Sequence, residues 1–84
     1  MRFVFTMNMP SHNGNPVHQV IAEHNARSIP ELLQVVAGVD FLLVDEFYVK
    51  RDTNQRQYLE RRGQIALNPL FIGKIKEMEG DLSQ

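Results

Sequence analysis

Asp45 and Glu46 are the most conspicuous candidates for chemistry in this sequence, because they interrupt an otherwise apolar stretch. Paired carboxylates can act as a general acid and base or bind a divalent cation. Adjacent residues of a strand, however, point to opposite faces of a sheet, so the two side chains cannot meet at one substrate unless a β-bulge redirects them. We therefore expect a structural role, in which each carboxylate pairs with a cation on a neighbouring strand.

An assumed hairpin register predicts which residues pair with the two carboxylates. If residues 53–54 form the tip of a hairpin, Glu46 lies opposite Arg61 and Asp45 lies opposite Arg62. The same register places most apolar residues opposite one another, which stabilises paired strands. Its expected pairs are Leu42 with Ile65, Tyr48 with Leu59, and Val49 with Tyr58. A shift of one residue would undo the two ion pairs.

Three histidines, His12, His18 and His24, recur every six residues, and imidazole is a common metal ligand. On a strand, His18 and His24 would stand about 20 Å apart at roughly 3.3 Å per residue, which is too far for a shared metal ion. Ser11 beside His12 suggests nucleophilic catalysis by a serine hydroxyl. However, no nucleophile-elbow glycine pattern surrounds Ser11. We expect no catalytic residue, no metal site and no cofactor, and predict that the protein is not an enzyme.

The second half of the chain concentrates positive charge. Residues 50–76 hold seven basic and two acidic side chains, whereas residues 1–49 hold two basic and five acidic ones. Cations alternate there with tyrosines, and a sheet surface that presents both can contact phosphates and stack bases. The candidate contacts for nucleic acid or another partner are Tyr48, Lys50, Arg51, Arg56, Tyr58, Arg61 and Arg62. The net charge of −1 and the acids Asp52 and Glu60 weigh against nucleic acid.

Two strands are expected before any helix. Residues 2–9 alternate between apolar and polar side chains, which is typical of a half-buried strand. Residues 10–16 contain Asn13-Gly14 between two prolines, a composition that predicts a hairpin loop. Residues 17–25 are expected to return as the second strand.

A short helix is predicted next, because Ser28 and Glu31 have the spacing of a capping box and Pro30 is tolerated in a first helical turn. Gly38 can end the helix in the left-handed conformation. One apolar face is expected to consist of Ile29, Leu32, Leu33 and Val36.

The rest of the chain predicts a second hairpin. Residues 41–49 carry apolar side chains for both faces of a strand, which indicates a central position in the sheet. Residues 51–55 form a polar turn, and residues 57–67 return as a strand. Beyond it, Asn68 could cap a helix, or a single turn could lead to a short final strand over residues 72–78. We favour the final strand.

These elements predict an α+β fold: a small antiparallel sheet in the order β-β-α-β-β with a fifth strand, and one helix packed on one face. With 84 residues, the chain is expected to form a single domain over residues 1–84. The absence of cysteine excludes disulfides, thiolate metal sites and thiol catalysis. No apolar run approaches the roughly 18 to 20 residues of a membrane span, so we expect a soluble, cytoplasmic protein without membrane contact.

The resulting expectation is a small non-enzymatic protein-interaction or regulatory module. Its partner would be another protein or a second copy of the chain, as in a homodimer, because one short helix leaves edge strands and apolar side chains uncovered. The alternative is a nucleic-acid-binding module that uses the basic hairpin from Tyr48 to Arg62. Replacing Arg56, Arg61 and Arg62 separates the two hypotheses: loss of nucleic-acid binding favours the second, and loss of folding favours structural ion pairs.

Overall fold

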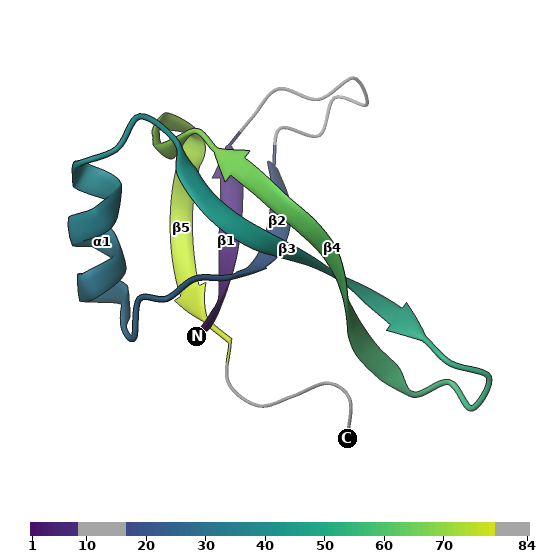
Figure 1. The fold of residues 1–84 in the computed structure, drawn as a ribbon. Coiled ribbons are helices and arrows are strands. Elements are labelled where there is room, and N and C mark those ends of the chain that lie inside the picture. The colour runs from purple at the N-terminus through teal and green to yellow at the C-terminus, as the bar shows by residue number, and fades with distance from the viewer. Residues whose placement is uncertain (9–16, 79–84) are drawn as a thin grey trace.

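The computed structural model describes residues 1–8 and 17–78, which form one α-helix and a five-stranded antiparallel sheet (Figure 1). The strands lie in the order β4-β3-β2-β1-β5. Their bounds are β1 (Arg2–Asn8), β2 (Val17–Glu23), β3 (Leu42–Arg51), β4 (Gln57–Leu67) and β5 (Ile72–Glu77), and the helix is α1 (Ile29–Ala37). The predicted α+β fold, with its fifth strand, is confirmed.

Three features of the sequence lie outside the described residues. They are the expected turn at Asn13-Gly14, the neighbouring Ser11 and His12, and the last residues after Met78. The first two strands flank that turn and pair as predicted, although β2 ends at Glu23 and not at Asn25.

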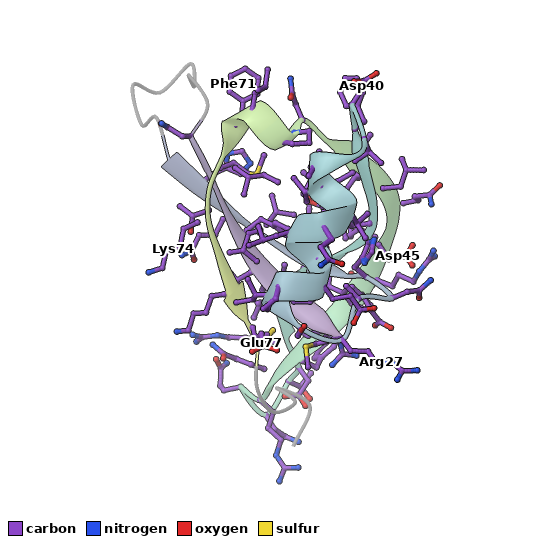
Figure 2. All side chains as sticks on the ribbon, turned by 90° about the vertical axis from the view of Figure 1, so that its left-hand side faces the viewer. Arg27, Asp40, Asp45, Phe71, Lys74 and Glu77 are labelled. Atoms are coloured by element: carbon purple, nitrogen blue, oxygen red, sulfur yellow. The ribbon has the colours of Figure 1, made fainter. Side chains whose placement is uncertain are left out.

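Helix α1 covers one face of the sheet (Figure 2), which we call the helix face; the opposite face is the bare face. The alternation in β1 places Phe3, Phe5 and Met7 on the helix face, where each is at most 1% exposed. The buried core on this face consists of Phe3, Phe5, Met7, Val20, Ala22, Ala26, Leu32, Leu42, Val44 and Leu67. One apolar face of one sheet therefore supplies most of the burial that stabilises the fold.

The start of α1 matches the predicted cap with one difference. The Ser28 side-chain oxygen accepts a hydrogen bond from the Glu31 backbone N–H at 3.3 Å. The Glu31 carboxylate accepts from the backbone N–H of Arg27 at 3.2 Å, one residue before the expected donor. Both bonds satisfy amides at the helix entrance, and Pro30 lies in the first turn as expected.

Two expectations about α1 are wrong. Gly38 has φ −105° and is not left-handed; its N–H bonds to the Val35 carbonyl oxygen at 3.1 Å, which closes a tighter last turn. Leu33 is 50% exposed, whereas Leu32 is fully buried. The apolar stripe in contact with the sheet is narrower than the four predicted positions, because among residues 1–8 and 17–78 only the sheet packs against this short helix.

The register of the β3–β4 hairpin also differs from the prediction. Leu42 pairs with Leu67, and Tyr48 pairs with Glu60. One reason is the turn: the loop spans residues 52–56 and places Gln55 in the left-handed region at φ 66°. The other is a bulge beside Glu46, where the ladder skips one residue of β4. The predicted register was two residues off before the bulge and one residue off after it.

Among the described strands, none pairs with the outer part of this hairpin, beyond residue 47. Strand β3 pairs with β2 only at residues 45–47, which lie opposite Glu23, Ala22 and Ile21. Beyond this point each strand pairs only with the other strand of the hairpin, and we call residues 48–62 the hairpin arm. Figure 1 shows the arm extending beyond the rest of the sheet. The expected central strand β3 is thus interior at its base and part of a two-stranded ribbon further out.

The ambiguous segment after β4 forms a turn and then a strand, as we favoured. The Asn68 side chain accepts a hydrogen bond from the Leu70 N–H at 3.0 Å and caps a 3-10 turn, η1 (Pro69–Phe71). Strand β5 follows and pairs antiparallel with β1. Within the described residues, no helix has the length and apolar character needed to cross a bilayer.

Candidate functional site

All seven candidate contact residues lie on the hairpin arm, and they divide between its faces. Cross-strand pairing places Arg51 and Arg61 on the bare face, together with Val49. The helix face of the arm carries Tyr48, Lys50 and Tyr58, and Arg56 belongs to the loop. The side chains are exposed or, for Lys50, partly exposed. The predicted residues are thus accessible, and they are spread over both faces of the arm and its loop.

Asp52 shapes the tip of the arm. Its carboxylate oxygen accepts hydrogen bonds from the N–H groups of Asn54 at 2.8 Å and Arg56 at 2.9 Å. Its backbone N–H donates to the Arg56 carbonyl oxygen at 3.0 Å. The acidic residue that weighed against nucleic-acid binding is therefore a turn-forming residue, which bonds to its own loop.

Neither expected ion pair forms between the described residues, and a different pair takes their place. Arg61 donates to Asp45 at 2.7 Å, whereas Asp45 was expected to meet Arg62. Glu46 lies opposite Gly63 and not opposite Arg61. Because the Arg61 and Asp45 side chains are 60% and 41% exposed, this pair contributes at most about 1 kcal/mol. The pair joins β3 to β4 at the base of the arm, and its contribution to the free energy of unfolding is small.

The remaining cations of the arm differ in their partners. Lys50 lies 3.6 Å from the Glu60 carboxylate. The Arg62 guanidinium lies over the Tyr48 ring, 4.5 Å from its centroid. Arg51, Arg56 and Arg62 form no ion pair with any residue that the structure describes. Three guanidinium groups therefore remain available to an anionic partner.

Glu23, His24 and Asp45 gather around a small hollow of about 150 Å³ and are the best candidates for acid–base chemistry. Each already has a partner. Asp45 binds Arg61, Glu23 lies 3.7 Å from the Arg2 side chain, and the His24 Nδ1 accepts the Ala26 N–H at 2.9 Å. These contacts link Arg2 of β1 with Glu23 of β2, and Asp45 of β3 with Arg61 of β4.

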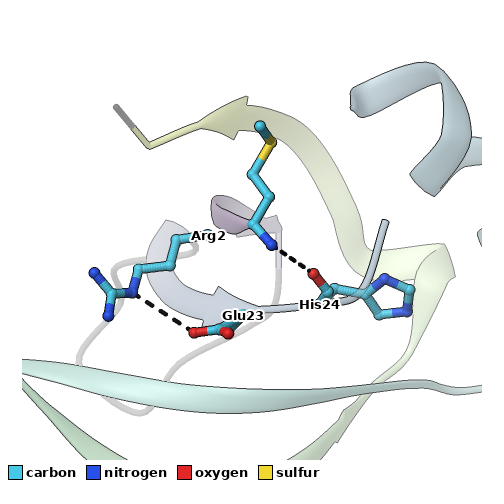
Figure 3. A network of polar contacts seen from close by, with 4 residues as sticks. Arg2, Glu23 and His24 are labelled. Carbon is cyan, nitrogen blue, oxygen red and sulfur yellow. Dashed lines mark hydrogen bonds and ion pairs between the residues drawn. The ribbon is translucent and has the colours of Figure 1, made fainter. Parts of the chain in front are cut away.

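Figure 3 shows two of the links around Glu23 and His24. Arg2 faces Glu23 from the neighbouring strand, and the Met1 amino nitrogen donates to the His24 backbone oxygen at 2.8 Å. The Arg2 guanidinium also lies over the Phe47 ring, 5.1 Å from the centroid. Arg2 thereby connects β1 with β2 and β3 on the bare face.

The two histidines within the described residues, His18 and His24, lie near opposite ends of β2. His18 is exposed in β2, opposite Met7, and His24 follows the end of that strand. No group of three or more His, Asp or Glu side chains within residues 1–8 and 17–78 could hold a metal ion.

A broad hollow of about 550 Å³ is lined by Val4, Gln19, Lys76, Glu77 and Met78. Its charged groups are the Lys76 amine and the Glu77 carboxylate.

A second surface was missed by the sequence analysis. Large apolar side chains are exposed where β3 begins and β4 ends, with Phe41 57% and Leu70 88% accessible. We call this surface the apolar end and define it by Val39, Phe41, Leu43, Leu70 and Phe71. Figure 2 shows the neighbouring Asp40 and Phe71 at the same end of the molecule. A hollow of about 280 Å³ lies there, lined by Val36, Val39, Asp40, Asn68, Pro69 and Leu70.

A signal for the apolar end exists in the sequence. The apolar residues Val39, Phe41, Leu70 and Phe71 lie in short connectors, where polar turn residues are usual. An analysis of hydrophobic periodicity does not detect these residues, because connectors have no regular alternation of apolar and polar side chains.

No family model matches the chain, and no curated protein or solved structure matches it either.

Proposed function

We propose that the protein is a non-enzymatic interaction module that binds a second copy of itself through the apolar end. The observation that carries the proposal is the exposure of Phe41 and Leu70. They are the chain neighbours of Asp40 and Phe71, which lie at one end of this small fold (Figure 2). Contiguous exposed apolar surface is unusual on monomeric proteins and is typical of association sites.

A second copy fits this surface because the apolar end carries both a hollow and projecting side chains. Val36, Val39, Pro69 and Leu70 contribute apolar walls to the hollow, and Leu70 is 88% exposed. Phe41 follows the lining residue Asp40 in the chain and is 57% exposed. In a twofold interface, each copy can insert its projecting side chain into the hollow of the other, so one patch serves twice. Burial of large apolar side chains would then stabilise the pair.

Analytical ultracentrifugation of the full chain tests the proposal. We expect a dimer in the wild type and a monomer in Phe41→Glu and Leu70→Glu, because a carboxylate in the interface would lose its hydration. Val49→Glu on the hairpin arm is the matched control and should remain dimeric. Circular dichroism confirms that each variant is folded.

The proposal fails if the wild type stays monomeric at about 1 mM, since association would then be weaker than roughly −4 kcal/mol. It also fails if Val49→Glu dissociates the dimer while the variants of the apolar end do not.

A further inference from the structure

We propose that the hairpin arm binds duplex DNA by entering the major groove and contacting phosphates on both sides. This inference does not depend on the proposed self-association, because the arm and the apolar end lie at opposite ends of strands β3 and β4 (Figure 1).

The charge of the arm favours a polyanion. Residues 48–62 carry five cations and the two acids Asp52 and Glu60. Asp52 bonds to amides of its own loop, and Glu60 lies beside Lys50. Residues 1–49 carry a net negative charge, so the field of the molecule directs a polyanion to the arm.

The three available guanidiniums point to different surfaces of the arm. Arg51 lies on the bare face, opposite Gln57 in the ladder. Arg62 lies on the helix face, over the Tyr48 ring, and Arg56 lies in the loop at the tip. A ligand must therefore offer phosphates on both sides of the ribbon. The two walls of a duplex groove do so.

In the part of the chain that the structure describes, the arm is a ribbon of two strands, and this gives it a suitable width. The major groove of B-DNA, roughly 12 Å wide, admits a two-stranded β-ribbon. The major groove of duplex RNA is deep and narrow and does not admit side chains. Single strands are typically held in one groove with stacked aromatic rings, whereas Tyr48 is already covered on one side by Arg62. These arguments favour DNA duplex over the other two.

Fluorescence anisotropy with a labelled DNA duplex of about 20 base pairs, measured across a salt series, tests the inference. We expect a slope of log affinity against log salt of about −3, because three guanidiniums displace counterions. The variant Arg51→Gln/Arg56→Gln/Arg62→Gln should lose most of this slope and bind at least about tenfold more weakly at low salt. Arg27→Gln, which removes an exposed guanidinium beside α1, is the control and should bind like the wild type.

Asp52→Asn gives a test in the opposite direction. Asparagine keeps a side-chain oxygen for the Asn54 and Arg56 amides but removes one negative charge, so binding should tighten. All measurements are repeated in the Leu70→Glu background. Binding by that variant supports the inference even where self-association fails.

Three results would overturn the inference. The first is no binding of the duplex by the wild type at low salt. The second is equal loss in Arg27→Gln and in the triple variant, which would indicate a diffuse charge effect. The third is tighter binding of the single strand or of duplex RNA with the same sequence, which would remove the argument from groove width.

Discussion

Arg62 lies over the ring of Tyr48, and it does so from the position that the β-bulge leaves without a cross-strand partner. Phe47 pairs with Arg61 and Glu46 pairs with Gly63, so Arg62 is the extra residue of β4. Arg62, the residue that the ladder skips, thus contacts Tyr48 of the opposite strand at the base of the arm.

The cation–π contact should be measurable by a double-mutant cycle. We expect Tyr48→Leu and Arg62→Met to show a coupling free energy of about 0.5 to 1 kcal/mol in urea unfolding, the usual range at exposed sites. Tyr48→Phe, which keeps the ring, should retain most of the coupling. A coupling near zero would mean that the contact contributes nothing to stability.

Gly63 should resist substitution because of its backbone conformation. Its φ is 122°, and a Cβ there would meet no atom within 4 Å, so only strain opposes a side chain. We expect Gly63→Ala to lower the free energy of unfolding by roughly 1 to 3 kcal/mol.

Gly73 is the matched control for Gly63. A Cβ at Gly73 would lie 3.5 Å from the Thr6 carbonyl oxygen, which is an ordinary contact. Gly73→Ala should therefore change the stability by less than roughly 0.5 kcal/mol in the same urea titration. Equal effects at the two glycines would contradict the assignment of strain to the bulge.

Neighbouring leucines of α1 should differ strongly. Leu32 is fully buried against the sheet, so Leu32→Ala should cost about 2 to 5 kcal/mol and shift the urea midpoint. Leu33 is half exposed, and Leu33→Ala should cost less than about 1 kcal/mol. Similar losses at both positions would mean that α1 is covered on its outer side, for example by a partner.

The elements were predictable because their signals are local. Ser28 and Glu31 mark the start of α1 within four residues of sequence, and the alternation in β1 identifies its buried side chains. The short final strand was also foreseen, since Asn68-Pro69 stops β4. Such patterns depend on backbone geometry and periodicity, which sequence exposes directly.

The register and the apolar end were not predictable in the same way. The register depends on Gln55 adopting a positive φ, a conformation that favours glycine or asparagine, and on a bulge next to Gly63. The exposure of Phe41 and Leu70 depends on where connectors come to lie after the sheet has formed. Both the register and this exposure are determined by the tertiary structure and not by the conformational preferences of short sequence segments.

The strand order also separates two kinds of folding event. Strands β3 and β4 are joined by a short loop, so the hairpin arm can form by local closure at small entropic cost. Phe5, in contrast, pairs with Val20 on one side and with Ile75 on the other, which joins the first strand to the last. The strand that carries the most deeply buried side chains therefore gains its second neighbour only through the longest-range contact in the sheet. We expect docking of β5 on β1 to limit the folding rate, with the arm forming early and nearly independently of the core.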